Sequence, residues 1–213
     1  MILLLFGAPG AGKGTLAEML TKHYKLPHVS TGDLLRYHLS KGTEIGKKAK
    51  EYMDTGLLVP DDVVLEILEE KMDEKDCHRG YVLDGFPRTV EQAEALDEMI
   101  EERSAKISHV FNIDVPRDVI VKRLCARRVC SKCGAIYNVE FKPPKKEGTC
   151  DVCGAPLMHR SDDKDDVIRK RLAEYESKTR PVLDYYQKKN LVRTVKGTDS
   201  AEMFGKIVDI VGK

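Results

Sequence analysis

Gly7-Ala-Pro-Gly-Ala-Gly-Lys-Gly-Thr15 is the stretch that decides the fold of this 213-residue chain. It follows the apolar run 1–6, which is typical of a buried strand, and precedes residues 13–24, which have helical character. A strand, a glycine-rich turn and a helix in this order are the context of a phosphate-binding loop. The glycines let backbone N–H groups turn toward an anion, and the helix N-terminus adds a partial positive charge. We therefore predict that nucleotide phosphates are bound by Gly10, Ala11, Gly12, Lys13, Gly14 and Thr15.

One position departs from the general pattern of such loops. That pattern has Ser or Thr directly after the lysine, whereas this chain has Gly14 there and Thr15 one position later. The hydroxyl at that position binds Mg²⁺ in GTPases and many ATPases. The departure argues against those classes, and it leaves Mg²⁺ to the phosphates and to carboxylates that act through water.

The remaining pattern alternates strands with helices. We expect further strands at 81–83, 110–113 and 191–195, and helices at 92–102, 117–128, from about 165, and at 200–211. Another helix follows Asp61, which can cap it. Such alternation predicts an α/β fold in which a P-loop parallel sheet is flanked by helices. The glycine-punctuated region 30–60 reads as a small helical insertion, and the cysteine-rich region 129–160 as a second insertion.

Composition excludes several classes of partner. Hydrophobic residues make up 41% of the chain and charged residues 33%, which is ordinary for a globular protein. A net charge of +1 gives no bulk electrostatic basis for binding nucleic acid or a membrane surface. The apolar run 1–6 is too short for a signal peptide or a membrane span. We therefore expect a cytoplasmic protein whose thiols stay reduced.

Four of the six cysteines form two Cys-x₂-Cys pairs. This spacing predicts a tetrahedral four-thiolate zinc site, with Fe²⁺ or Co²⁺ as alternatives, in a zinc-ribbon-like segment. Four thiolates leave no open coordination position, so the metal is expected to be structural. Cys77 and Cys125 lie outside the quartet, and we expect both to be small buried hydrophobes. The predicted ligands are Cys130, Cys133, Cys150 and Cys153.

Further motifs follow the glycine-rich loop in order. They are Ser30-Thr-Gly-Asp-Leu-Leu-Arg36, Leu83-Asp-Gly-Phe-Pro-Arg-Thr89, Arg123 with Arg127-Arg128, Arg160-Ser-Asp-Asp163 and Arg169-Lys-Arg171. With these motifs nearly the whole chain resembles the adenylate kinases, which transfer the terminal phosphoryl group of MgATP reversibly to AMP and form two ADP. The resemblance implies a monomer with a core of residues 1–29, 60–126 and 165–213. It also implies an AMP-binding insertion at 30–59 and a lid at 127–164 that closes over ATP.

The resemblance assigns residues to each nucleotide. For AMP it implies Thr31, Arg36, Leu57, Leu58, Val59, Gly85, Phe86, Pro87, Arg88, Gln92, Arg160 and Arg171. Among these, Gln92 would read the adenine edge. For ATP it adds, beyond the glycine-rich loop, Arg127, Ile136, Tyr137 and Asp199. The catalytic groups would be Lys13, Arg88, Arg123, Arg160 and Arg171.

The chemistry agrees with a site made of cations. Phosphoryl transfer needs positioning and charge stabilisation more than covalent help. The phosphate of AMP has a second pKa of about 6, so it is largely a dianion at neutral pH and attacks without a general base. Guanidinium groups match phosphate oxygens in a bidentate way. Closure of the lid would keep water out, and we expect lid motion to be the slow step.

Carboxylates have two expected roles. We assign Asp84, which follows a predicted strand, to Mg²⁺ through water, with help from Asp33, although Asp33 could instead cap a helix. Asp162 and Asp163 are expected to anchor the lid by pairing with arginines.

Three alternatives remain from the sequence. A CMP or UMP kinase would share most motifs, although Gln92 and Thr31 favour adenine. A zinc-ribbon nucleic-acid-binding module is disfavoured by the net charge and by the lack of an aromatic and basic face. An ATP-sensing regulator without turnover is disfavoured by the complete set of arginines.

Overall fold

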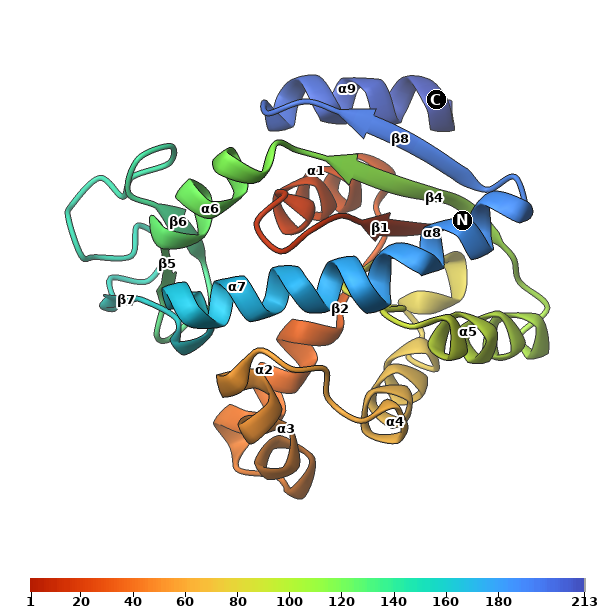
Figure 1. Cartoon of the computed structure of the whole chain (residues 1–213), viewed down its shortest axis with the longest axis horizontal. Helices are drawn as coiled ribbons and strands as arrows, with labels where there is room; N and C mark the ends of the chain where they lie inside the picture. Colours follow the sequence, from red (N-terminus) through yellow and green to blue (C-terminus); the bar gives the residue numbers. More distant parts are fainter. Residues whose placement is uncertain (213) are drawn as a thin grey trace.

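A five-stranded parallel sheet forms the centre of this computed structural model, which describes residues 1–212 (Figure 1). The strands are, in spatial order, β2 (His28–Ser30), β3 (Tyr81–Asp84), β1 (Ile2–Phe6), β4 (Ile107–Asp114) and β8 (Val192–Lys196). Every pair of neighbours runs parallel. The predicted α/β class is therefore confirmed, and all carboxyl ends of the strands meet at one edge of the sheet.

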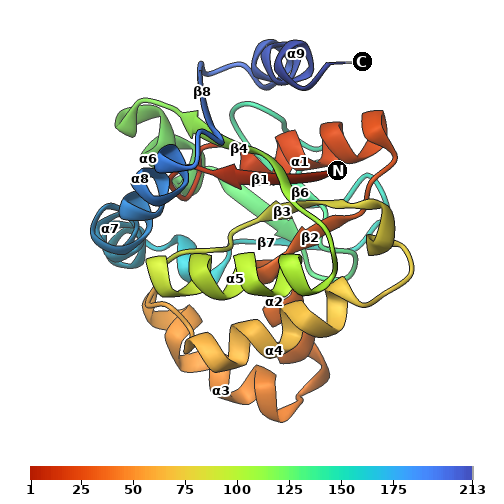
Figure 2. The same ribbon diagram turned by 90° about the vertical axis from the view of Figure 1, so that its right-hand side faces the viewer.

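Helices cover both faces of the sheet (Figure 2), and the central strand β1 is therefore buried on both sides. Its residues alternate between two apolar clusters: Ile2, Leu4 and Phe6 face one, Leu3 and Leu5 the other. The first cluster is closed by α4 (Asp61–Met72), α5 (Val90–Glu102) and α8 (Arg180–Lys188). The second is closed by α1 (Lys13–Tyr24), α6 (Arg117–Cys125), α7 (Asp165–Glu174) and α9 (Ser200–Val211).

Two segments extend away from this core (Figure 1). The first carries α2 (Thr31–Lys41) and α3 (Glu44–Thr55), which pack against each other. The second forms a separate antiparallel sheet in the order β6 (Ile136–Asn138), β5 (Arg127–Cys130) and β7 (Leu157–Met158). A short 3₁₀ turn, Ser161–Asp163, and then α7 lead back to the core.

Several element boundaries differ from the predictions. The helix expected to reach Arg128 ends at Cys125, because residues from Arg127 onward pair with β6 and β7. Pro60 occupies the N-cap of α4, so Asp61 is the first helical residue and not the cap. Cys125 is exposed, contrary to expectation, whereas Cys77 is buried as predicted. The last residue of the predicted core range, 213, lies outside the described residues.

None of the helices in residues 1–212 combines the length and the apolar character that crossing a bilayer requires.

Candidate functional site

The glycine-rich loop connects β1 to α1 at the carboxyl edge of the sheet. Gly10 has a φ of 87° and Gly12 a φ of 95°, a left-handed conformation that side chains disfavour. A Cβ on Gly10 would also lie 2.8 Å from Leu124 Cγ, so the loop sits directly on α6. Gly12 is the N-cap of α1 and provides no side-chain cap. The first N–H groups of α1 are therefore free for an anion.

Lys13 folds back over this loop. Its Nζ donates to the carbonyl oxygens of Gly7, at 2.7 Å, and Ala8, at 3.2 Å. Burial lowers the pKa of Lys13 to about 8; Asp84 counteracts this effect, and Arg88, Arg171 and Arg127 reinforce it. The site is thus short of negative charge around its central lysine.

Asp84 ends β3 beside the loop. A Cβ on Gly14 would lie 3.7 Å from its Oδ2, which places the carboxylate against the start of α1. The same oxygen is 3.7 Å from His28 Nε2 on the neighbouring strand β2. Burial alone would lower the pKa of His28, but the neighbouring carboxylate of Asp84 outweighs it and raises that pKa. Asp33, the other predicted carboxylate, pairs with Arg36 at 2.6 Å on α2.

Four predicted cations of the site lack a carboxylate within 4.0 Å among residues 1–212: Lys13, Arg88, Arg123 and Arg160. Arg88 Nε donates to the Gly85 carbonyl at 2.7 Å, and Arg123 donates to the carbonyls of Ala11 and Thr198. Arg160 Nε is buried without any hydrogen-bond partner. Burial and then the charges of neighbouring arginines lower the pKa of Arg88 to about 10 and of Arg160 to about 9. Such uncompensated, half-buried charge calls for an anion.

Arg127 and Arg171 are paired, as predicted, with Asp162 and Asp163, the two aspartates that follow Arg160. Arg127 makes a two-pronged contact with Asp163, whose side chain is fully buried. Arg171 lies 3.0 Å from Asp162 Oδ2 and 3.2 Å from Asp163 Oδ1. Although burial raises the pKa of Asp162, these arginines hold it below its ordinary value. Asp163 thus connects the base of the second segment to α7.

Several residues assigned to AMP gather next to β3. Thr31 Oγ1 donates to the Gly85 carbonyl at 3.0 Å, the same oxygen that Arg88 binds. Phe86, Pro87 and Val59 are buried, whereas Leu57 is exposed and Leu58 half-buried. Gln92 is only 2% exposed. Its Oε1 accepts from Arg88 N at 2.7 Å and its Nε2 donates to Asp61 at 2.6 Å, so in this structure the amide joins α5 to α4.

Residues assigned to ATP lie on different elements. Asp199 caps α9 by accepting from Glu202 N at 2.8 Å. Tyr137 is buried within the second segment, where its hydroxyl contacts Cys150 Sγ at 3.5 Å and accepts from Asp151 N at 2.8 Å. Only the backbone of Tyr137 is therefore left for a nucleotide, while Ile136 is half-buried.

The cysteine quartet comes together as the spacing predicted. The four sulfur atoms lie within 4.8 Å of one another and could hold a metal ion. Cys130 and Cys153 are 3.4 Å apart, and Cys133 and Cys150 are 3.5 Å apart. Backbone N–H groups point at Cys130 Sγ from Lys132 and Cys133. Burial raises the pKa of Cys150, but hydrogen bonds from Tyr137 and nearby backbone outweigh it and lower the pKa to about 6. This donor set suits a thiophilic tetrahedral ion.

Two residues next to the site escaped sequence reasoning. His28 approaches Asp84, and Asp61 orients Gln92. The first contact follows from the parallel pairing of β2, which begins at His28, with β3, which ends at Asp84. The second joins two helices and had no local signal.

Comparisons with known proteins match this geometry. The family model "Adenylate kinase" matches residues 5–191. Curated relatives named "Adenylate kinase" include one from Caldicellulosiruptor bescii, 53% identical with 93% of each chain covered. Another, from Thermodesulfovibrio yellowstonii, is 51% identical over the full length of both chains. A third, from Archaeoglobus fulgidus, is 49% identical and covers 99% of this chain and 97% of the relative. The chain therefore belongs to the adenylate kinase family and is a nucleotide phosphotransferase.

Proposed function

We propose that this chain transfers the terminal phosphoryl group of MgATP reversibly to AMP, giving two ADP. The observation that carries the proposal is the set of four cations that have no carboxylate within 4.0 Å in residues 1–212: Lys13, Arg88, Arg123 and Arg160. A site with this excess of positive charge suits several phosphate groups at once, and two bound nucleotides would supply them. The similarity to three curated relatives named adenylate kinase supports the same reaction.

The phosphate chemistry is assigned to cations on both sides of the transferred group. Lys13 and the loop N–H groups hold the phosphates of ATP, and Arg88 holds the phosphate of AMP. Arg123, Arg160 and Arg171 stabilise the charge that spreads over the transferring phosphoryl oxygens. Because AMP attacks as a dianion, no residue is needed as a general base.

We assign the two extended segments to the two nucleotides. Residues 30–59 bind AMP with Thr31, Arg36 and the stretch 57–59, next to residues 85–88. Residues 127–164, called here the lid segment, close over ATP, with contacts from Arg127, the backbone of 136–137, and the turn at Asp199. The amide of Gln92 keeps one N–H and one lone pair beyond the hydrogen bonds it makes, so it can still meet the adenine edge.

Two metal ions complete the proposal. Asp84 holds Mg²⁺ through water beside the phosphates, and Asp33 assists; the ion neutralises the charge of the triphosphate. Zinc is assigned to the cysteine quartet, where it fits because sulfur atoms bound to one tetrahedral Zn²⁺ at about 2.3 Å lie about 3.8 Å apart. The observed separations of 3.4 and 3.5 Å are close to that value. We further propose a cytoplasmic protein, since an exposed free thiol such as Cys125 stays reduced in a reducing compartment. We also propose that it is a monomer.

A coupled assay of ADP formation from ATP and AMP, with and without Mg²⁺, tests the reaction. We expect turnover that depends on both nucleotides and on Mg²⁺, and slower turnover with CMP or UMP in place of AMP. Lys13→Met should remove most activity and leave the fold intact by circular dichroism. Unchanged turnover in that variant, or preference for CMP or UMP, would contradict the proposal. Light scattering checks the monomer, and filter binding with labelled RNA checks that nucleic acid is not a partner.

A further inference from the structure

Gln92 holds its side-chain amide between two groups of opposite polarity. The residue is only 2% exposed. Its Oε1 accepts from Arg88 N at 2.7 Å, and its Nε2 donates to Asp61 Oδ1 at 2.6 Å. A backbone N–H can only donate and a carboxylate can only accept, so the two partners permit one of the two orientations of the amide. These contacts therefore fix which end of the amide is the oxygen.

The contact with Arg88 belongs to the start of α5. Thr89 is the N-cap of this helix, and its hydroxyl accepts from Gln92 N at 3.1 Å. A glutamine three residues after such a cap commonly turns back to the backbone N–H of the cap. Here the amide reaches the N–H of Arg88, one residue earlier. Helix capping thus explains the bond at Oε1, but it requires nothing at Nε2.

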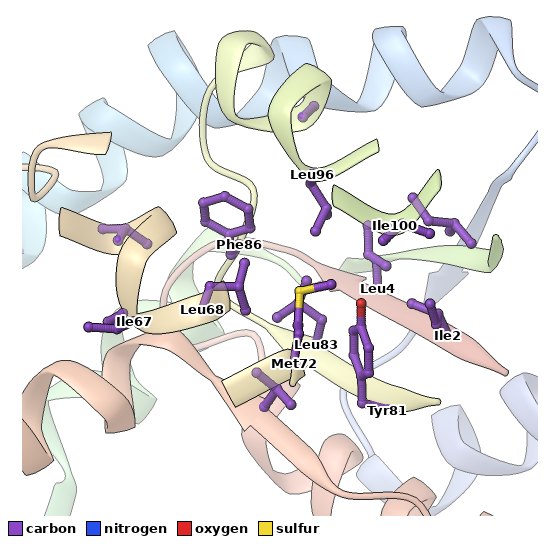
Figure 3. Close-up of a cluster of buried hydrophobic side chains, with 14 of the residues drawn as sticks. Ile2, Leu4, Ile67, Leu68, Met72, Tyr81, Leu83, Phe86, Leu96 and Ile100 are labelled. Atoms are coloured by element: carbon purple, nitrogen blue, oxygen red, sulfur yellow. The ribbon is translucent and has the colours of Figure 1, made fainter. Parts of the chain in front are cut away.

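The contact with Asp61 has no such local explanation, because Asp61 begins α4 and lies 31 residues before Gln92. Among the described residues its carboxylate makes no ion pair, and its one hydrogen-bond partner is the amide of Gln92. Helices α4 and α5 pack on the same apolar cluster, in which Leu68, Phe86 and Leu96 take part (Figure 3). Packing therefore holds the carboxylate and the amide in place relative to each other.

Two hydrogen-bonding positions of the amide remain free, one N–H and one lone pair of Oε1. An adenine base offers an acceptor at N1 and a donor at its 6-amino group. A 6-oxopurine such as hypoxanthine offers the reverse, a donor at N1 and an acceptor at O6. The amide must be turned over to exchange one base for the other. Turning it would bring two acceptors together at Asp61 and two donors together at Arg88.

We propose that Asp61 is a specificity-determining residue, which selects a 6-aminopurine monophosphate over a 6-oxopurine monophosphate by holding the amide of Gln92 in one orientation. This role rests on the proposed function, since it takes AMP as the nucleotide beside Gln92. Asp61 is a positioning residue, because it acts on the base through Gln92 and does not touch it. A site that is built to hydrogen-bond one pattern of donors and acceptors rejects the opposite pattern strongly.

The test compares kcat/KM for AMP with kcat/KM for inosine monophosphate at saturating MgATP. Wild type should prefer AMP at least about 100-fold. Asp61→Ala should lower this ratio about 30-fold, because the amide then turns over without losing the bond to a charged acceptor. Turnover of inosine monophosphate should rise in absolute terms. A merely structural role would give the opposite result, since a loosened fold lowers the rates with both nucleotides.

Three further variants show whether Asp61 acts through the amide. Asp61→Asn keeps an acceptor for Gln92 Nε2, so the ratio should stay within about fivefold of the wild-type value. Asp62→Ala is the matched control, because this neighbouring carboxylate of α4 is exposed and makes no side-chain hydrogen bond or ion pair in the part of the chain that the structure describes. It should leave the ratio unchanged. In a Gln92→Leu background, Asp61→Ala should change the ratio no further.

The outcomes separate this role from the proposed function. A wild-type ratio in Asp61→Ala, with AMP turned over normally, would overturn the role and leave the proposed function intact. An equal fall of the ratio in Asp61→Ala and Asp61→Asn would also overturn it, because an acceptor at this position would then not matter. Asp61→Ser is a second variant without the carboxylate, should Asp61→Ala fold poorly. A wild type that does not turn over AMP would contradict the proposed function, and the role of Asp61 with it.

Discussion

Lys13 shows at the scale of one residue how the site is prepared for phosphate. Its ammonium donates to two loop carbonyls, but burial, reinforced by the charges of neighbouring arginines, lowers its pKa to about 8. A lysine whose pKa is lower in the folded state than in the unfolded chain opposes folding below that pKa, and the penalty disappears as the pH rises above about 10.5. A bound triphosphate reverses the local charge, which restores the pKa of Lys13. Binding and protonation are therefore coupled.

The first prediction follows from this coupling. At pH 9 the free protein should take up close to one proton when it binds ATP, and the affinity for ATP should fall as the pH rises above about 8. Isothermal titration calorimetry in two buffers with different ionisation enthalpies measures the uptake. Lys13→Arg should take up clearly less than wild type, since a guanidinium in the same place stays protonated to a higher pH than an ammonium. A wild-type uptake near zero at pH 9 would contradict the charge state assigned to Lys13.

Arg160 carries the second prediction because its Nε is buried without a partner. Arg160→Lys keeps the charge but loses the planar fork, so kcat should fall about 100-fold or more while circular dichroism stays unchanged. Initial rates of ADP formation give the comparison. Arg128→Lys is the control: the Arg128 guanidinium donates only to the carbonyls of Cys125 and Arg127, and the change should cost little activity. Similar rates for both variants would remove Arg160 from the phosphate site.

At the scale of an element, the lid segment shows a sheet that side-chain packing alone does not stabilise. Its fully buried apolar residues are only Cys130, Tyr137 and Cys150. Strands of two to four residues around so small a core need another source of free energy. A tetrahedral metal site supplies on the order of 10–16 kcal/mol in comparable small folds. We therefore expect the metal proposed for the four-thiolate site to decide whether this element is folded.

The third prediction concerns removal of that metal. Chelation, or Cys150→Ala, should lower the Tm and raise hydrogen exchange throughout residues 127–158, while β1 and β3 stay protected because they pack in the core. Elemental analysis of the native protein should give one metal ion per chain. Cys77→Ala, at a buried thiol outside the quartet, should leave the metal content unchanged. Native protein without metal, or exchange that rises equally in β1, would contradict this role.

The element scale also shows what the sequence predicts and what it does not. Four of the five strands and the helices around the glycine-rich loop follow from local periodicity, because each carries its own apolar pattern, whereas β2, only three residues long, was not predicted as a strand. The end of α6 does not, since Arg127–Cys130 become a strand only by pairing with segments elsewhere in the chain. We predicted from the sequence that Asp162 and Asp163 pair with arginines, but not that Arg127 is the partner of Asp163. The bridge from Asp61 to Gln92 was missed because it depends on how two helices pack.

At the scale of the whole molecule, the two extended segments touch each other. Ser161, at the base of the lid segment, donates to Asp54 of α3 at 3.0 Å. Gly56, just after α3, packs so tightly on α7 that a Cβ there would lie 2.9 Å from Val167 Cγ1. Movement of one segment is therefore coupled to the other through the hydrogen bond from Ser161 to Asp54, whereas Gly56 joins residues 30–59 to the core helix α7. This arrangement favours closure of both segments together, which protects the transferring phosphoryl group from water.

The last prediction tests whether opening of these segments limits turnover. Ser161→Ala removes one hydrogen bond worth about 0.5–1.5 kcal/mol, so the closed state should open roughly 2- to 10-fold faster. If opening is the slow step, kcat and the KM values for both nucleotides should rise together. Steady-state rates and relaxation dispersion on the lid segment measure both quantities. Ser177→Ala is the control, because that hydroxyl donates only to carbonyls of its own helical segment. Faster opening with an unchanged kcat would show that chemistry, and not opening, limits the rate.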